Sequence, residues 1–260
     1  MTARLLEGRR GLVLGVSGVE SIGYHVARTA IALGAEVAIT CRAPRLAGLQ
    51  TLAAGLPASL HVLEVDDEAS VAAVFEALGA HDRPLDFLVH TLVHVPEGVL
   101  ERPLVDVTRG DFERVLSSSA WSLVAACREA RPLLARSDAP RVVALTSACG
   151  HRMTPRYHVA GIAKAALESA VLYLAMALGR EGILVNAVGA SLIPTQGALR
   201  AVGAHNAEAT RAVQARRSAT GRAVVFDEVA DAVAFLCSPL ARNVTGEILT
   251  IDGGFARAYL

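Results

Sequence analysis

A single lysine occurs in this 260-residue chain, at position 164, against 24 arginines. It follows Tyr157 by seven residues, in the stretch YHVAGIAK. In an α-helix, residues seven apart point in directions about 20° apart, so these two side chains would share one face. A tyrosine hydroxyl is a proton donor, and a fixed ammonium group nearby lowers its pKa and donates hydrogen bonds to a ribose. We therefore expect Tyr157 and Lys164 to be catalytic residues.

Lysine at this position has a chemical explanation and a trivial one. A guanidinium is a wide planar fork, whereas an ammonium is a compact group with three donors, so arginine is a poor substitute at such a site. A chain that otherwise uses arginine and yet keeps Lys164 would then need lysine chemistry there. The alternative is that the one remaining lysine stands at this position by chance.

The elements that must position these residues follow from the hydrophobic pattern, in which short apolar runs alternate with longer helical stretches. We expect strands at 11–15, 35–40, 60–65, 85–90, 141–147, 182–188 and 247–252. We expect helices at 21–34, 66–79, 109–136, 158–180 and 227–237. This alternation predicts a parallel sheet covered on both faces, in an α/β, doubly wound (Rossmann-type) fold. Residues 1–260 should form one domain, with a partly helical substrate lid near 189–225.

A glycine-rich turn follows the first expected strand, with Gly15 and Gly18 ahead of Ser21. Glycines let a ligand approach the backbone closely, and the free N–H groups at the start of the next helix would face a pyrophosphate. The spacing differs from GxGxxG, so an ordinary glycine-rich turn is the alternative. The second strand ends at Thr40-Cys41-Arg42, where a cofactor without a 2′-phosphate usually meets an acidic residue.

The residue at that strand end favours one nicotinamide cofactor over the other. Arg42 stands there with Arg45 close by, and a guanidinium suits a phosphate dianion. We therefore predict NADPH, in preference to NADH. A solvated surface arginine is the alternative interpretation.

The composition excludes several classes of function. The formal net charge is +0 and the pI is about 7.1, so nothing points to nucleic acid or an anionic membrane as a partner. The four cysteines form no CxxC pair and are typical of small buried residues in a reducing compartment. No histidine pair has a carboxylate at ligand spacing, so we expect no metal site. The longest uncharged stretches contain glycine and proline, which does not suggest a membrane span. We expect a cytoplasmic protein.

Over nearly its whole length the chain resembles the short-chain dehydrogenase/reductase superfamily, and within it the divergent enoyl-acyl carrier protein reductases. That branch has Tyr-x6-Lys where most of the superfamily has Tyr-x3-Lys. The similarity includes LVH at 88–90, PRYHVAGIAKAALE at 155–168, LVNAV at 184–188 and TGEILTIDGGF at 245–255. It implies a homotetramer that reduces the 2,3 double bond of an enoyl thioester, carried by acyl carrier protein or CoA, in fatty acid or polyketide biosynthesis.

The resemblance also implies roles for individual residues. Tyr157 would stabilise the enolate at the thioester carbonyl, and Lys164 would hold the nicotinamide ribose. The positions that match cofactor contacts of that branch are Gly15, Ser21, Ile22, Arg42, Glu64, Val65, Thr91, Leu92, Lys164, Ile193 and Thr195.

The chain departs from the branch at positions that matter for chemistry. Where the branch has a second tyrosine, ten residues before Tyr157, this chain has Ser147. Ketoreductases of the superfamily hold a carbonyl with a serine at the end of this strand, so Ser147, Tyr157 and Lys164 resemble their triad. A ketoreductase therefore stays an alternative, although no asparagine precedes Asn186 to form that group's asparagine motif and proton relay. Val93 and Ser191-Leu192 also replace smaller or stiffer residues near the nicotinamide. Together these departures favour a relative in a specialised biosynthetic pathway over the housekeeping fatty-acid enzyme, and they leave a catalytically silent relative open.

Two further features of the sequence have open interpretations. Trp121 replaces a tyrosine on the long helix, where it would either line the acyl pocket or fill core. Four arginines of the expected lid would either receive an acidic carrier protein or a CoA phosphate, or form a solvated basic face; they are Arg211, Arg216, Arg217 and Arg222.

Overall fold

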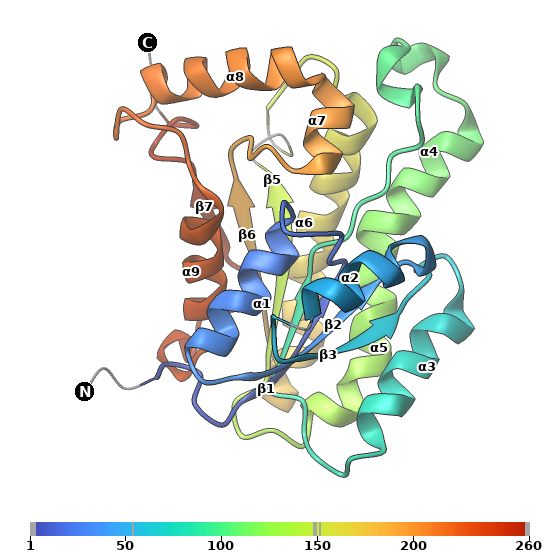
Figure 1. The fold of residues 1–260 in the computed structure, drawn as a ribbon, viewed down its shortest axis with the longest axis vertical. Helices are drawn as coiled ribbons and strands as arrows, with labels where there is room; N and C mark the ends of the chain where they lie inside the picture. The colour runs from blue at the N-terminus through green and yellow to red at the C-terminus, as the bar shows by residue number, and fades with distance from the viewer. Residues whose placement is uncertain (1–3, 54, 148–149, 151, 258–260) are drawn as a thin grey trace.

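The computed structural model describes residues 4–53, 55–147, 150 and 152–257, and within them seven strands form one parallel sheet (Figure 1). The strands are β1 (Arg10–Leu14), β2 (Glu36–Cys41), β3 (Ala58–Val62), β4 (Phe87–His90), β5 (Arg141–Ser147), β6 (Leu184–Ala190) and β7 (Ile248–Ile251). Their order is β3-β2-β1-β4-β5-β6-β7, and every neighbouring pair runs parallel. The order reverses between β1 and β4, where open sheets of this kind bind ligands. The predicted doubly wound, Rossmann-type fold is confirmed.

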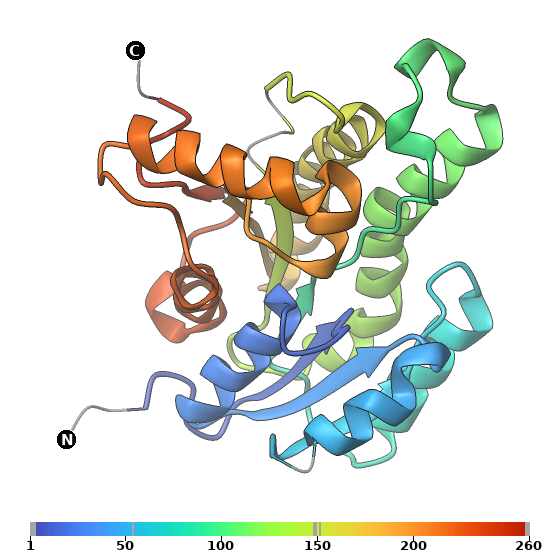
Figure 2. The ribbon, with the colours of Figure 1, turned by 45° about the horizontal axis from the view of Figure 1, so that its top comes forward.

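Helices cover both faces of the sheet (Figure 2). They are α1 (Ile22–Ala32), α2 (Leu46–Ala53), α3 (Glu68–Gly79), α4 (Arg109–Leu116), α5 (Ser122–Leu134), α6 (His158–Leu178), α7 (Gln196–Val202), α8 (Ala204–Arg217) and α9 (Phe226–Cys237). Successive residues of a strand point to opposite faces. In β1, Val13 therefore packs with α1, α2 and α9, whereas Leu12 and Leu14 pack with α3, α5 and α6.

The predicted elements are present, with three differences. The third strand ends at Val62, so Glu64 and Val65 lie in the turn before α3 and not in the strand. Helix α2 was not predicted, because its apolar sequence LAGLQTLA has no clear polar face. The predicted helix 109–136 consists of α4, a π-helical turn at Ser117–Trp121, and α5.

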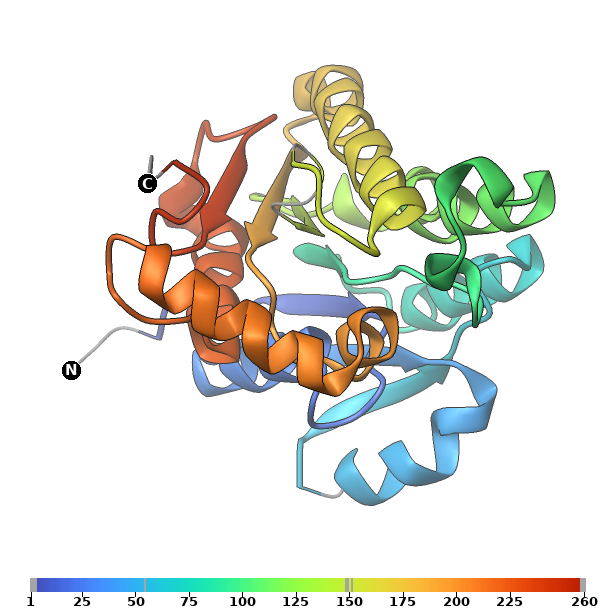
Figure 3. The same ribbon diagram turned by 90° about the horizontal axis from the view of Figure 1, so that it is seen from above.

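The expected lid, residues 189–225, is largely helical. Helices α7 and α8 lie across the carboxyl ends of the strands (Figure 3). They are separated by Gly203, whose φ of +81° is a conformation that glycine adopts without strain. At the start of α7, the Gln196 amide donates to the Glu20 carboxylate at 3.1 Å, so the lid touches the turn after β1.

Among the described residues, one stretch, His158–Glu181, is long and apolar enough to cross a membrane by length and composition alone. It comprises α6 and a short turn that continues it. Its buried residues, including Leu167 and Val171, pack in the core on the α3, α5 and α6 side of the sheet. A core helix of this kind meets the same length and composition test.

Candidate active site

Lys164 is buried in α6, with 5% of its surface exposed, and it joins two neighbouring strand ends. Its Nζ donates to the Leu145 carbonyl of β5 at 2.8 Å and lies 3.5 Å from the Leu92 carbonyl, just after β4. Burial lowers its pKa to about 8, while the nearby Glu168 carboxylate acts in the opposite direction. A compact ammonium with three donors fits between two carbonyls and still has a donor to offer.

Tyr157 is not part of a helix, which corrects the geometric argument made from its spacing to Lys164. It caps the N-terminus of α6 with φ −135° and ψ 15°. Its N–H donates to the Thr154 carbonyl at 3.3 Å, and its carbonyl accepts from Gly161 at 2.6 Å. The half-buried ring packs on a small cluster that includes Val99 and Val159. The turn before α6, and not helical periodicity, therefore sets the direction of this side chain.

Ser147 ends β5, two residues after the carbonyl that accepts from Lys164. It is half-buried and pairs in register with Ala190 of β6. The structure thus places Ser147 at the same edge of the sheet as Lys164. Residues 148, 149 and 151, between this strand end and Tyr157, lie outside the described part of the chain.

Glu168 belongs to this site and was not singled out from the sequence. It is 3% exposed, and its Oε1 accepts from the Thr146 hydroxyl at 2.7 Å. A side chain at Gly150 would lie 2.8 Å from the same oxygen, so the segment after β5 approaches the carboxylate closely. The spacing of four from Lys164 was the available signal, because residues four apart are neighbours on a helix surface.

The turn after β1 has the form of a phosphate cradle. Gly15 has φ +93°, and a Cβ there would lie 2.6 Å from the Leu92 side chain. The Ser21 hydroxyl donates to the Gly18 carbonyl at 2.7 Å and accepts from the N–H of Tyr24 at 3.3 Å, which caps α1. Ile22 is the first residue of that helix. The bare backbone at Gly15 and the helix start beside it fit a pyrophosphate.

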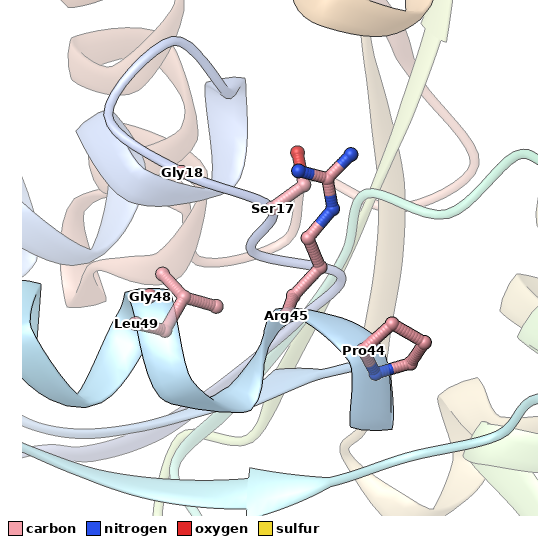
Figure 4. A pocket seen from close by; sticks show the side chains of 6 residues that line it. All are labelled: Ser17, Gly18, Pro44, Arg45, Gly48 and Leu49. Atoms are coloured by element: carbon pink, nitrogen blue, oxygen red, sulfur yellow. The ribbon is translucent and has the colours of Figure 1, made fainter.

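A cavity of about 190 Å³ adjoins this turn, between it and the start of α2 (Figure 4). Its lining residues are Ser17, Gly18, Pro44, Arg45, Gly48 and Leu49. Arg45 and the phosphate turn therefore line one cavity, at the position where the sheet order predicts the adenosine half of a dinucleotide.

Arg42 has an acidic partner that the sequence around it does not contain. Its Nε lies 3.3 Å from Oε2 of Glu64, and the N–H of Ala43 donates to Oε1 of the same carboxylate at 3.0 Å. Both side chains are partly exposed, at 58% and 40%. The carboxylate comes from the turn after β3, which lies beside the end of β2. The Glu64 carboxylate therefore occupies the side of Arg42 that would otherwise be free to bind a 2′-phosphate.

The remaining candidate residues lie on both sides of the switch point, the place between β1 and β4 where the strand order reverses. Thr91 and Leu92 follow β4, and Val65 is half-buried in the turn before α3. Thr195 caps α7 by accepting from the N–H of Ala198 at 3.0 Å. Ile193 is buried in the core beside α1 and α9, so its side chain serves packing.

Two other candidates lie away from this site. Trp121 is 45% exposed and lines an outward groove of about 620 Å³, together with Phe112 and Leu116. Arg211 donates to the carbonyls of Leu192 and Val224 at 3.0 and 3.1 Å, one on each side of the lid helices.

Two more of the four arginines also have partners within the chain. Arg217 lies over the Phe255 ring, 5.6 Å from its centroid, and Arg222 pairs with Glu228. These contacts within the chain argue against the interpretation in which the arginines are available to bind an acidic carrier protein. Among the described residues, no three His, Cys, Asp or Glu side chains gather as a metal site would require.

Comparison with known proteins gives the same result by sequence and by structure. A family model described as enoyl-(acyl carrier protein) reductase matches residues 15–256. Enoyl-(acyl-carrier-protein) reductase (NADH) 2 of Rhizobium meliloti is 36% identical, over 96% of this chain and 92% of that protein. The Escherichia coli enzyme FabI, also named for NADH, is 35% identical over 98% and 97%.

Two solved structures are similar throughout. The Aquifex aeolicus enoyl-(acyl-carrier-protein) reductase (NADH) superposes with a TM-score of 0.92 at 30% identity, covering 98% of this chain and 99% of that one. The Bacillus cereus enoyl-acyl carrier protein reductase, solved with NADP⁺ and an indole naphthyridinone, gives 0.93 at 32% identity, with coverage of 98% and 99%.

These relatives correct the cofactor prediction. The names of the curated relatives specify NADH, so the prediction of NADPH was wrong, although the Bacillus cereus structure holds NADP⁺. The physical reason lies in the Arg42–Glu64 pair. The prediction treated Arg42 as an unopposed cation, because Glu64 is 22 residues further along the chain.

Proposed function

Because the chain belongs to the enoyl-(acyl carrier protein) reductase family, we propose that it uses NADH to reduce the 2,3 double bond of an enoyl group held as a thioester on acyl carrier protein. The observation that carries this proposal is the buried Lys164 between the ends of β4 and β5, next to the cradle formed by Gly15 and Ser21. That arrangement suits a nicotinamide ribose and a pyrophosphate side by side.

Each residue of the site has a definite task in this proposal. When bound, NADH supplies the hydride to the β-carbon of the substrate. Tyr157 donates a hydrogen bond to the thioester oxygen, where negative charge develops as the hydride arrives. Lys164 has three donors, one of which the Leu145 carbonyl takes at 2.8 Å, so a donor remains for the ribose hydroxyls. Ser147 offers a second hydroxyl to the carbonyl, at the end of β5.

The cofactor would extend across the switch point between β1 and β4. The backbone at Gly15 and the capped start of α1 would hold the pyrophosphate. The other residues proposed to contact the cofactor are Ile22, Arg42, Glu64, Val65, Thr91, Leu92, Ile193 and Thr195. Of these, Ile193 would act through its backbone, because its side chain is buried in the core. The Glu64 carboxylate beside Arg42 would face the adenosine ribose, which favours hydroxyls there over a further phosphate.

The test is oxidation of NADH, followed by absorbance, with crotonyl and acetoacetyl thioesters of acyl carrier protein measured side by side. We expect turnover of the crotonyl substrate and its loss in Tyr157→Phe. Turnover of the acetoacetyl substrate alone would refute the proposal and assign a ketoreductase that uses Ser147, Tyr157 and Lys164. Binding of NADH without turnover of either substrate would assign a catalytically silent relative.

We also propose that residues 1–260 form one domain of a cytoplasmic homotetramer. An apolar face on α4, α5 and α6 supports self-association: Leu172, Tyr173 and Met176 of α6 are all more than half exposed, and Trp121 lines the neighbouring groove. Light scattering coupled to gel filtration should give a tetramer, and Met176→Arg should reduce its size. A monomeric wild-type protein at micromolar concentration would contradict this part of the proposal.

A further inference from the structure

Three buried serines lie where the helix that runs from α4 to α5 is interrupted. Ser117–Trp121 form a π-helical turn between α4 and α5, and such turns are frequent at functional sites. Ser118, Ser119 and Ser122 are all nearly inaccessible to solvent. Burying a hydroxyl is costly unless it is hydrogen-bonded, so the partners of these three side chains show what the turn does.

Ser118 holds the backbone of His94 at both of its polar groups. Its Oγ accepts from the N–H of His94 at 3.0 Å. The same hydroxyl has two carbonyls within reach as acceptors, His94 at 3.1 Å and Val115 at 3.2 Å. One side chain of the π-helical turn therefore fixes the far end of the segment that leaves β4.

Ser122 holds the near end of that segment, through the last residue of β4. Its Oγ lies 2.9 and 3.1 Å from the carbonyls of Ser118 and Ser119, to which it donates. It is therefore the acceptor for Nε2 of His90 at 2.7 Å. Burial, together with the charge of Lys164, holds the pKa of His90 at about 3, so the imidazole is neutral.

The segment between these two contacts reaches both halves of the candidate site. The Thr91 hydroxyl donates to the Leu14 carbonyl at 2.6 Å, and the Leu92 carbonyl lies 3.5 Å from Nζ of Lys164. The Leu92 side chain also occupies the space into which a Cβ at Gly15 would project. A displacement of residues 91–93 would therefore change the surroundings of both Lys164 and Gly15.

We propose that Ser118 and Ser122 are positioning residues that clasp the segment Thr91–Val93 against the nicotinamide half of the cofactor, with the Leu92 carbonyl held beside Lys164. This inference rests on the proposed function. Neither serine needs to touch the cofactor, because each acts through the backbone or side chain of a histidine that flanks the segment. The adenosine half would lie elsewhere, beside the cavity lined by Ser17 and Arg45, and would not depend on the clasp.

The same turn offers a matched pair of variants, Ser118→Ala and Ser119→Ala. Both remove one buried hydroxyl from adjacent positions, but the Ser119 hydroxyl has no hydrogen-bond partner among the described residues. Calorimetric titration with NAD⁺ and with AMP separates the two halves of the cofactor, since AMP lacks both the nicotinamide ring and the ribose that Lys164 would hold. We expect Ser118→Ala to weaken NAD⁺ binding about tenfold and to leave AMP binding unchanged, as suits the loss of one or two buried hydrogen bonds.

Three further expectations complete the test. The kcat with the crotonyl substrate should fall in Ser118→Ala, and Ser118→Thr, which keeps the hydroxyl, should recover NAD⁺ affinity. Ser119→Ala should match the wild-type protein in all measurements. If Ser118→Ala does not fold, Ser122→Ala tests the other end of the clasp against the same control.

The outcomes distinguish failure of the clasp from failure of the proposed function. Equal weakening of NAD⁺ and AMP binding, or equal effects of Ser118→Ala and Ser119→Ala, would overturn the clasp, because a general loosening of the turn predicts both. A wild-type protein that reduces the crotonyl substrate, with no change of NAD⁺ affinity in Ser118→Ala, would overturn the clasp alone. A wild-type protein that binds neither nucleotide would overturn the proposed function and the clasp together.

Discussion

Replacing Glu168 by glutamine should move the pH at which the enzyme loses activity. The carboxylate raises the pKa of Lys164, which burial otherwise lowers, to a net value of about 8. Glutamine has the same shape and keeps an oxygen for the Thr146 hydroxyl, which now lies 2.7 Å from Oε1. The substitution thus removes a charge with little change in packing.

The direction and size of the effect follow from the charge. An opposite charge on a neighbouring turn of a helix is worth about one pKa unit or more, so the pKa of Lys164 should fall to about 7. The ammonium holds the ribose in our proposal, and it is lost as pH rises through that pKa. At pH 8 the protonated fraction should drop from about one half to about one tenth, a loss of about fivefold in kcat/KM, with almost no loss at pH 6.

The assay is kcat/KM for NADH between pH 5.5 and about 9.5, because this quantity reports groups of the free enzyme. Glu181→Gln is the control, since that carboxylate pairs with Arg131 beyond the far end of α6. We expect its profile to overlay the wild-type profile. A Glu168→Gln profile that keeps the wild-type midpoint would refute the reasoning, as would an equal loss at every pH.

Three further substitutions test separate parts of the site. Lys164→Met should abolish turnover and destabilise the fold by roughly 3 kcal/mol in urea unfolding, because it leaves the buried Glu168 carboxylate and the Leu145 carbonyl without the ammonium; an unchanged free energy of unfolding would contradict this. Glu64→Gln should raise kcat/KM for NADPH relative to NADH about tenfold by freeing Arg42, and an unchanged ratio would show that the pair does not govern the choice. Gly15→Ala should lower the melting temperature and NADH affinity together, because of its positive φ and the 2.6 Å approach to Leu92; wild-type values would refute the tight contact.

Local patterns in the sequence were sufficient to predict the strands and most of the helices that position the candidate site. Apolar runs and helical spacing depend on neighbours a few residues apart, so they predicted the strands of the sheet and most of its helices. The start of α1 at Ser21 was foreseen in the same way, because a capping hydroxyl acts on the next turn only. The method failed at α2, whose apolar composition has no polar face to mark a helix.

The candidate site was predicted from residue types more than from geometry, and it stays a prediction. Lys164 stood out because it is the one lysine in the chain, and the structure places it at the strand ends as a polar group buried among carbonyls. The position of Tyr157 did not follow from helical spacing, because the backbone departs from helical geometry at that residue. A repeat of seven indicates a shared face only when both residues lie in the helix.

What the sequence determined by itself was the alternation of strands and helices, the glycine turn and the presence of a lone lysine, all of which depend on short-range order. Only the tertiary structure decided which charges and hydroxyls meet. Glu64 reaches Arg42 across 22 residues, Thr146 reaches Glu168 across 22, and Ser118 reaches His94 across 24. Parallel strands bring their carboxyl ends to one edge whatever the length of chain between them, so strand order brings Glu64 to Arg42. The other two contacts depend on how α6 and the π-helical turn pack against β5 and the segment after β4.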